Sequence, residues 1–364
     1  MKRDMMTKHE LIRKVAKREA TDGRLPIYFH FADYVTEQKY ADYFGMSRAE
    51  FAEWMHNDLR DIFLLEDIHI ICSDARELEK ARERGFVFPS DLEGAASDRW
   101  GCHWSMHGLG QELRKGVFTD ITEAFDHAYP DPDNPAIFDG VQEKIDTFNA
   151  ADSGWYIAQY YTLFERAWGM TGYGAFLEAL YTEPEAVEFL LDKITDYKVR
   201  MAEKICEFNP TLGHTGDDFG LQIGPVMSLD IWKKYFKPRY EKIWGVYKKH
   251  GIPVMHHSCG DCRLFIEDMI DAGLDMLHPI QQTSMDINDV SERFSRDLSF
   301  FASIDTIETL TYGTKDDVIR NIENTVEKLG KHNGLLLGMI NVMPNTPPEN
   351  VEVAMKRMME LGGR

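Results

Sequence analysis

Short apolar runs that end in polar residues recur along the whole chain, and they restrict the fold more than any other feature of it. Eight such runs occur, at residues 25–31, 67–73, 154–160, 209–215, 252–257, 274–279, 298–303 and 334–340. The segments between the later runs have apolar residues at helical spacing and end in Gly251, Gly273 and Gly330. Buried strands that alternate with amphipathic helices are typical of parallel α/β proteins.

Eight strand and helix units joined by right-handed crossovers predict a closed (β/α)8 TIM barrel. A doubly wound open sheet is the alternative. We expect a single domain over residues 1–364, because no linker composition interrupts the pattern. Two parts lie outside the repeat: a helical N-terminal extension at 1–24 and a Trp-, Gly-, Asp- and Pro-rich region at 74–153. We interpret the second as an inserted lid with fragmentary helices over one end of the barrel.

Composition excludes several classes of protein. The net charge of −20 argues against nucleic-acid binding, which requires a basic surface. No apolar run approaches the roughly 18 residues of a membrane span. Five scattered cysteines in 364 residues do not form a disulfide framework. We therefore expect a cytoplasmic protein that acts on a small molecule, and the acidic surface is compatible with either a monomer or a homodimer.

The residues that follow the apolar runs are unusually rich in reactive side chains. In a TIM barrel these positions surround the active site at the C-terminal ends of the strands. They are His30, Asp33, Cys72, Asp74, Tyr160, Tyr161, His214, Asp217, Asp218, His257, Cys259, His278, Gln281, Gln282, Asp305 and Asn341. We expect these side chains to meet at one mouth.

The densest group is "HHSCGDC" at residues 256–262. His257 and Cys259 are two apart, so at the end of an extended strand both side chains project to the same side. Imidazole and thiolate are zinc ligands, and a catalytic zinc takes three protein ligands. Two alternatives remain open: a buried histidine beside a buried cysteine, or a redox pair formed by Cys259 and Cys262.

Aspartates form the second group. Asp217 and Asp218 lie between glycines in "GHTGDDFGLQIG", where carboxylates can bind a cation, act as general acid or base, or cap a turn. Asp305 in "FASIDTIETL" has the same alternatives, because it precedes a helical segment.

Several stretches together resemble the uroporphyrinogen decarboxylase superfamily. They are "FERAWGMTGYGAFLEALYTEPEAVEFLLDKI", "GDDFGLQIGPVMSLDIWKKYFKPRYEKIWGVYKKHGIPVMHHSCGD", "FASIDTIETLTYGTKDDV" and "MPNTPPENVEVAM". The resemblance implies a (β/α)8 barrel with its site at the C-terminal mouth. True decarboxylases carry an Arg-rich segment after the first strand and a glycine-flanked histidine after the last. Here the corresponding stretches are "HFADYV" and "GMINVMP", so the counter-charges for substrate carboxylates are missing.

The chain is more similar to the corrinoid-dependent methyltransferase branch of that superfamily. There the H-x-C motif binds zinc, so the resemblance implies that His257 and Cys259 are metal ligands. It also implies a partner corrinoid protein that carries methylcobalamin. A late cysteine of that branch falls here near Ile340 or Asn341, which leaves Cys262, Gln281 and Asp218 as candidates for the third ligand.

We therefore expect a zinc-dependent methyltransferase that transfers a methyl group to or from a corrinoid protein or small acceptor in C1 or demethylation metabolism. The alternatives are a metal-independent decarboxylase of the same barrel family and a non-catalytic ligand-binding relative. The expected catalytic residues are Asp218, Asp305 and Tyr160; the expected substrate-binding residues are His30, Asp217, Gln281 and Asn341; the expected metal ligands are His257 and Cys259.

Overall fold

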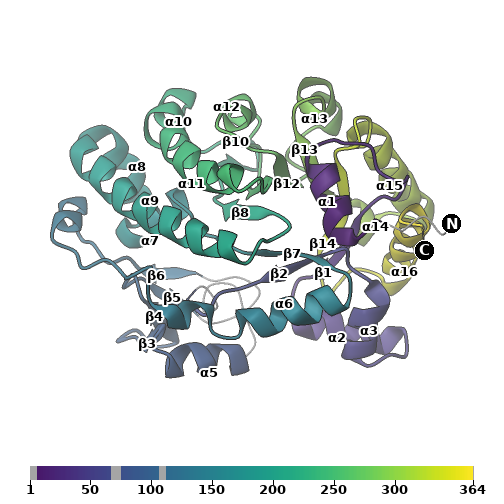
Figure 1. Cartoon of the computed structure of the whole chain (residues 1–364), viewed down its shortest axis with the longest axis horizontal. Helices are drawn as coiled ribbons and strands as arrows, with labels where there is room; N and C mark the ends of the chain where they lie inside the picture. The colour runs from purple at the N-terminus through teal and green to yellow at the C-terminus, as the bar shows by residue number, and fades with distance from the viewer. Residues whose placement is uncertain (1–5, 67–74, 106–111, 364) are drawn as a thin grey trace.

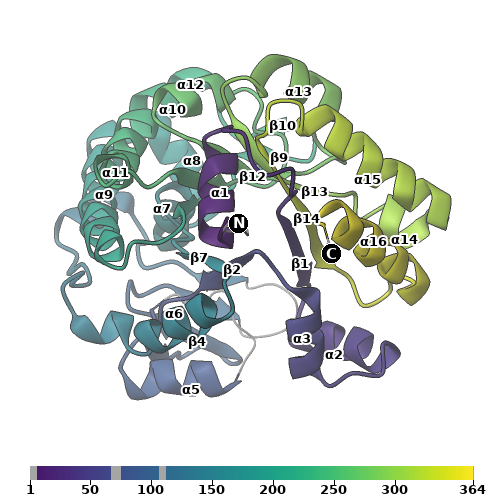
Figure 2. The same cartoon turned by 45° about the vertical axis from the view of Figure 1, so that its right-hand side comes forward.

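The computed structural model of the protein describes residues 6–66, 75–105 and 112–363. Six parallel strands form one curled sheet at its centre (Figures 1 and 2). Their order across the sheet is β1 (Ile27–Phe31), β14 (Leu335–Val342), β13 (Ser299–Ser303), β12 (Met276–Ile280), β11 (Val254–His257) and β8 (Gly213–Gly216). Because every neighbouring pair is parallel, all six strands end at the same edge. The α/β class predicted from the apolar runs is confirmed.

Two more parallel strands, β2 (Leu59–Ile62) and β7 (Gly154–Ile157), pair with each other in a ladder of their own. Single backbone hydrogen bonds join this pair to the large sheet near the start of the strands. The Asp58 N–H donates to the Ile27 carbonyl at 3.1 Å, and the Thr211 N–H donates to the Trp155 carbonyl at 2.9 Å. Among the described residues, the continuous ladder of the predicted closed barrel is therefore interrupted on both sides of β2 and β7.

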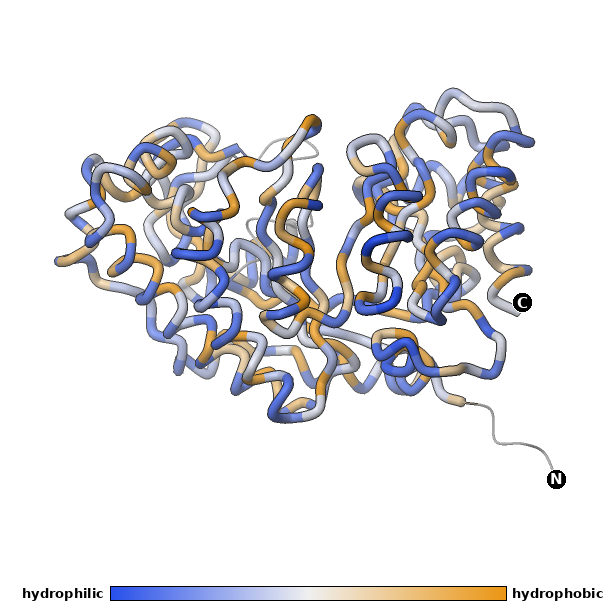
Figure 3. Tube along the Cα trace, turned by 90° about the horizontal axis from the view of Figure 1, so that it is seen from above, coloured by the Kyte–Doolittle hydropathy of each residue, from blue (hydrophilic) through white to orange (hydrophobic). Residues whose placement is uncertain are grey.

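Helices cover the outer face of the strands, and hydrophobic and hydrophilic positions alternate along them (Figure 3). They are α2 (Tyr34–Tyr43), α3 (Arg48–Met55), α7 (Phe164–Thr171), α8 (Tyr173–Thr182), α9 (Pro184–Glu207), α10 (Leu229–Tyr235), α11 (Lys237–Lys249), α12 (Ile266–Asp271), α13 (Ile287–Phe294), α14 (Thr309–Tyr312), α15 (Lys315–Leu329) and α16 (Pro348–Leu361). Pro238 lies in the first turn of α11, where its missing N–H needs no partner. In the described ranges, no helix has both the length and the apolar character of a membrane span.

The N-terminal extension contains α1 (Lys8–Ala16), which lies in the middle of the strand ring in Figure 2. Its buried residues Leu11, Ile12 and Val15 join a core formed by the inward side chains of the strands. The Ser299 hydroxyl, at the start of β13, donates to the Val15 carbonyl at 2.8 Å. The helix therefore closes the N-terminal end of the strands and leaves the opposite end for the site.

Most predicted strands lie where the apolar runs indicated, but the second strand differs. The run at 67–73 lies outside the described residues, and so do Cys72 and Asp74. The strand that pairs with β7 is Leu59–Ile62, whose sequence LRDI has two polar residues between two apolar ones. A strand with this sequence does not form an apolar run, so the pattern of apolar runs did not predict it.

The inserted region is more regular than the fragmentary helices that we predicted. Four short strands form an antiparallel sheet in the order β3 (Val87–Pro89), β4 (Ala95–Asp98), β5 (His103–Ser105) and β6 (Leu113–Lys115). This sheet lies between α5 (Ala75–Glu83) and α6 (Val141–Ala150) in sequence, with 3-10 turns at Ile121–Phe125 and Pro135–Phe138.

A buried carboxylate ties the inserted sheet to the barrel. Asp98 accepts the backbone N–H groups of Trp100 and Cys102 and the indole N–H of Trp104, each within 3.0 Å. Its Oδ2 also lies 2.6 Å from Nη1 of Arg166 on α7, and both side chains are almost fully buried. The inserted sheet is thereby fixed to the helix that follows β7.

Gly213→Ala tests the packing between β8 and α11. A Cβ at Gly213 would lie 2.4–2.8 Å from ring atoms of the buried Tyr247. We expect the substitution to lower the free energy of unfolding by about 1–3 kcal/mol in urea denaturation, because the ring must move. Gly245→Ala on α11 is the control: nothing lies within 4 Å of its Cβ position, so stability should stay equal or rise. If Gly213→Ala is as stable as wild type, the close contact between Gly213 on β8 and the Tyr247 ring on α11 is wrong.

Candidate metal centre and neighbouring cavity

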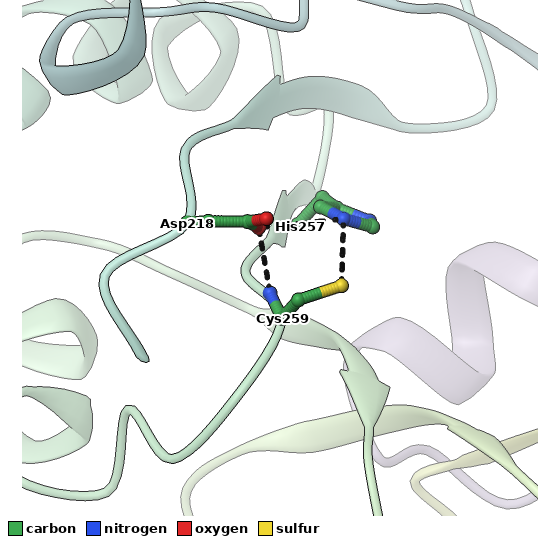
Figure 4. Close-up of side chains that lie close together, drawn as sticks. All are labelled: Asp218, His257 and Cys259. Atoms are coloured by element: carbon green, nitrogen blue, oxygen red, sulfur yellow. Dashed lines mark hydrogen bonds and ion pairs between the residues drawn. The ribbon is translucent and has the colours of Figure 1, made fainter. Parts of the chain in front are cut away.

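Three possible metal ligands meet at the C-terminal ends of two adjacent strands. The register of β8 and β11 pairs Gly216 with His257, and the Asp217 N–H donates to the His257 carbonyl at 3.0 Å. Asp218 and Cys259 follow these strand ends directly. The ligand atoms of Asp218, His257 and Cys259 all lie within 4.8 Å of one another (Figure 4). Asp218 is therefore the candidate third ligand that the structure brings to the predicted pair.

Two of the three separations between these atoms match those of a tetrahedral metal site, and the third is at most 4.8 Å. Cys259 Sγ lies 3.5 Å from His257 Nε2, and His257 Nε2 lies 3.6 Å from Asp218 Oδ1. Bonds of about 2.0–2.3 Å at the tetrahedral angle place neighbouring zinc ligands roughly 3.3–3.7 Å apart. The backbone N–H of Cys259 donates to Asp218 Oδ1 at 2.7 Å, which holds the carboxylate in place. The donor set and its spacing therefore fit zinc.

Two glycines allow the Cys259 turn to approach Asp218. Gly260 has φ +73°, and a Cβ there would lie 2.4 Å from the backbone of Gly220. Gly220 belongs to a short antiparallel pair, β9 (Gly220–Leu221) and β10 (Gly224–Pro225), and the Asp261 N–H donates to the Leu221 carbonyl at 2.9 Å. The glycines of "DDFG" and "SCGD" are thus needed for close contact of the two loops that carry the ligands.

His278 on β12 holds the far side of the His257 ring. The register pairs these two residues, and their Nδ1 atoms lie 2.9 Å apart. A hydrogen bond between two ring nitrogens has one proton, so one ring donates and the other accepts. If His257 Nε2 is the metal ligand, the donor is His257 Nδ1–H and the acceptor is His278 Nδ1.

Burial keeps the nitrogen and sulfur ligands uncharged in the metal-free protein. It lowers the pKa of His257, although Asp218 opposes this shift. It raises the pKa of the Cys259 thiol, and the nearby carboxylates of Asp218 and Glu165 add to the shift. A metal cation would therefore take the place of the thiol proton and relieve the crowding of negative groups.

A cavity of about 270 Å³ opens beside Cys259 at the ends of β11 to β14. Gln281, Asp305 and Asn341, which we expected at the site, line it together with Cys259. Gln281 Oε1 accepts the backbone N–H of Gly260 at 3.0 Å and so supports the Cys259 turn. The predicted metal ligands and three predicted substrate or catalytic residues thus share one region.

Comparisons with known proteins identify the family. The family model described as uroporphyrinogen decarboxylase (URO-D) matches residues 161–361, a range that includes Asp218, His257 and Cys259. The chain belongs to the uroporphyrinogen decarboxylase family. The resemblance predicted from the motifs is confirmed.

Uroporphyrinogen decarboxylases from two strains of Thermus thermophilus are 23% identical to this family member over 185 residues. The alignment covers 50% of this chain and 51% of theirs, so the chain spans about half the length of these curated relatives. A methyltransferase from Methanosarcina mazei matches in structure with a TM-score of 0.66 over 98% of this chain and 99% of that chain. At 14% identity, that likeness shows the fold.

Asp217 has a structural position in this family member, in contrast to the substrate-binding role that we expected. Its carboxylate accepts the backbone N–H groups of Leu163, Phe164 and Glu165 at 2.7–3.0 Å, together with the hydroxyl of Tyr240. The residue has no exposed surface. It therefore holds the first turn of α7 beneath the site, and the adjacent Asp218 faces the metal ligands.

Asp305 also caps a turn, which was the alternative to its predicted catalytic role. Its two carboxylate oxygens accept the backbone N–H groups of Ile307, Glu308 and Thr309 at 2.9–3.1 Å. The Thr309 hydroxyl donates to it at 2.7 Å. With both oxygens occupied in this way, Asp305 is better suited to shaping the cavity than to moving a proton.

Tyr160, His30 and Asn341 lie at the mouth, where we predicted them. The Tyr160 ring packs against His257 and His214, with centroid distances of 5.2 and 4.8 Å. Burial raises the pKa of Tyr160, so the phenol is uncharged. Asn341 has φ 57° near the end of β14. Their contacts with substrate remain predictions.

Two acidic residues at the mouth escaped the sequence analysis. Glu165 lies in the first turn of α7, and burial followed by the charges of Asp218 and Asp217 raises its pKa. Asp61 on β2 accepts the Tyr28 hydroxyl at 3.3 Å, and its charge also raises the pKa of Tyr160. Asp61 was missed because the strand that carries it, Leu59–Ile62, was not predicted. Glu165 could have been identified as a candidate from its position just after the third apolar run.

Asp217→Asn and Asp218→Asn distinguish the structural role of Asp217 from the metal-binding role expected for Asp218. We expect Asp217→Asn to lower the free energy of unfolding by roughly 2–3 kcal/mol, because an amide cannot accept all of the hydrogen bonds that end on this buried carboxylate. Asp218→Asn keeps the oxygen that accepts the Cys259 N–H, and the side chain is 43% exposed, so stability should change little. Chemical denaturation of both metal-free variants makes the comparison. A larger loss of unfolding free energy in Asp218→Asn than in Asp217→Asn would contradict the structural role assigned to Asp217.

Proposed function

We propose that the protein is a zinc-dependent methyltransferase that exchanges a methyl group between a corrinoid protein and a small molecule in C1 or demethylation metabolism. The observation that carries the proposal is the convergence of Asp218, His257 and Cys259 at the ends of two neighbouring strands. Three protein ligands of mixed N, O and S type leave a fourth tetrahedral position for a substrate atom. Membership of the uroporphyrinogen decarboxylase family and the fold shared with a methyltransferase support it.

The bound zinc would hold a thiol or similar acceptor in its anionic, nucleophilic form at neutral pH. The other steps belong to the residues of this chain. With Nε2 of His257 on the metal, its Nδ1–H would donate to Nδ1 of His278, 2.9 Å away. The Cys259 N–H fixes the Asp218 carboxylate. The Tyr160 ring covers one side of His257 and limits the access of water.

Glu165 is the group in this region suited to hold a proton. Burial and the negative charges of Asp218 and Asp217 favour its neutral carboxyl form. Glu165 therefore lies near a candidate metal ligand without adding a further negative charge.

Decarboxylation is the alternative function that an experiment must distinguish from methyl transfer, because the curated relatives are uroporphyrinogen decarboxylases. A substrate with several carboxylates needs cationic partners. Neither lysine nor arginine lines the cavity beside Cys259 in the described part of the chain. Methyl transfer from methylcobalamin without release of carbon dioxide is the result that we expect. Release of carbon dioxide by metal-free protein would indicate the lyase instead, and a lack of both reactions would indicate a ligand-binding protein.

Metal content tests the proposal most directly. We expect about one zinc per chain by elemental mass spectrometry of untagged protein, because the donor set is complete. Cys259→Ser and Asp218→Asn should each lose most of this zinc. Cys206→Ser is the matched control, since it removes a thiol from α9 and should keep the metal. The proposal fails if wild type binds no zinc, or if Cys259→Ser retains it.

His278→Leu tests the orientation of His257. Without an acceptor for Nδ1–H, the His257 ring loses the hydrogen bond that directs Nε2 to the metal. We expect zinc affinity, measured by competition with a chelator, to fall about 10–100-fold. His278→Gln offers an acceptor oxygen and should recover much of the loss. Wild-type affinity in His278→Leu would show that the contact between the rings has no role in metal binding.

A further inference from the structure

The cavity beside Cys259 is enclosed by the ends of four strands and the loops that follow them. Cys259 follows β11, Pro279 lies on β12, Ser303 ends β13 and Ile340 lies on β14. A molecule in the cavity therefore reaches the sulfur of a candidate metal ligand from the side of β12 to β14. The chemical class of that molecule is indicated by the residues that line the cavity.

Most polar groups in these walls already have partners within the protein. The Gln282 amide donates at 2.9 Å both to the Ser303 carbonyl and to the Thr325 hydroxyl, and its oxygen accepts from Asn321. The Thr306 hydroxyl donates to the Ile340 carbonyl at 2.9 Å. These groups stabilise the walls and have little capacity left for a ligand.

Asp305 supplies the only charged side chain among the described residues that line the cavity. Its oxygens accept the amides of the following turn, as shown above. A carboxylate, sulfonate or phosphate on a ligand would therefore enter without a counter-charge. Burying an unpaired charge is far more costly than burying an uncharged group.

The remaining surface of the walls is largely apolar. Side chains of Pro279, Ile304, Ile307, Ile340 and Met343 contribute it. Ile307 is 51% exposed, so it stands at the opening of the cavity. Pockets that are mainly apolar with few polar groups bind small organic ligands, and the polar groups fix their orientation.

Two amide side chains remain for such a role. Gln281 uses its oxygen for Gly260, while its Nε2 has one long contact, at 3.3 Å, to the Thr283 hydroxyl. Asn341 is exposed at the end of β14. Each can bond to a neutral oxygen of a ligand without requiring a charge.

We propose that this cavity binds an uncharged, mainly apolar organic molecule of about ten non-hydrogen atoms, with its reacting group at Cys259. The size follows from the volume of about 270 Å³, which equals about nine water molecules at roughly 30 Å³ each. The inference rests on the proposed function and names the class of its small-molecule substrate. It excludes from this cavity molecules that enter with a carboxylate, sulfonate or phosphate group; an acceptor thiol would enter uncharged and lose its proton only on the metal.

A matched pair of probes tests the charge preference. 4-Methoxybenzyl alcohol and 4-methoxybenzoate have nearly the same shape and differ by one negative charge. Their binding is measured by isothermal titration and ligand-observed NMR, on metal-free and on zinc-loaded protein. We expect the alcohol to bind at least about tenfold more tightly than the anion in both forms. The walls offer the anion no cation, and in the zinc-loaded form the Cys259 thiolate and the Asp218 carboxylate would offset the two charges of the metal.

Met343→Arg shows whether the probes bind in this cavity. The new guanidinium should weaken binding of the alcohol and strengthen that of the anion, each by about tenfold. Tyr181→Arg is the matched control: it places the same charge on a side chain of α8 that is 70% exposed and outside the cavity. Its affinities should equal those of wild type.

Three results would overturn the proposal. They are equal or tighter binding of 4-methoxybenzoate by wild type, unchanged affinities in Met343→Arg, and no binding of the alcohol up to about 5 mM. These results are distinguishable from failure of the proposed function. If the protein binds zinc but does not prefer the alcohol, only the proposed substrate class is wrong. If it binds the alcohol tightly but binds no zinc, the ligand proposed for the cavity is supported and the zinc-dependent function is wrong.

Discussion

The register of three neighbouring parallel strands determines the candidate centre. Gly216 on β8 pairs with His257 on β11, which in turn pairs with His278 on β12. Because parallel strands end at one edge, the residues just beyond them must share a small volume. Asp218 and Cys259 are the first side chains beyond these ends that are free to turn toward His257. A shift of β11 by one residue would point His257 to the opposite face.

The site also depends on buried charges that contact no ligand atom. Asp217 holds the start of α7, and Asp98 of the inserted sheet pairs with Arg166 on the same helix. A buried carboxylate is stable in the folded protein where several hydrogen-bond donors surround it. Loss of one of these partners then lowers the free energy of unfolding more than loss of a surface contact does. These two ties place Glu165 close to the metal ligands. The inserted sheet thereby supports the site through α7 as well as adding to the core.

Strands that are buried on both faces could be predicted from the sequence, because they form continuous apolar runs. Runs such as 298–303 have that character and became β13. The strand Leu59–Ile62 was missed because it carries Arg60 and Asp61 in its middle. The Asp61 carboxylate accepts the Tyr28 hydroxyl, a partner that only the folded structure brings to it. The antiparallel sheet of the insertion was missed as well, since its strands of three or four residues have too few positions to show alternation.

The α/β class, the family, and the proximity of His257 to Cys259 were predictable from the amino-acid sequence alone, because each depends on spacing over a few residues or on local periodicity. The sequence could not tell Asp217 from Asp218. The two are adjacent and chemically identical, and only the packing of α7 above β8 decides that one is enclosed by amides while the other faces His257. The same holds for His278 and Gln281, which contact His257 and Gly260 from the neighbouring strand β12 and the residue just after it, 21 residues further along the chain. Contacts of that kind depend on the lateral pairing of strands, which a local pattern does not encode.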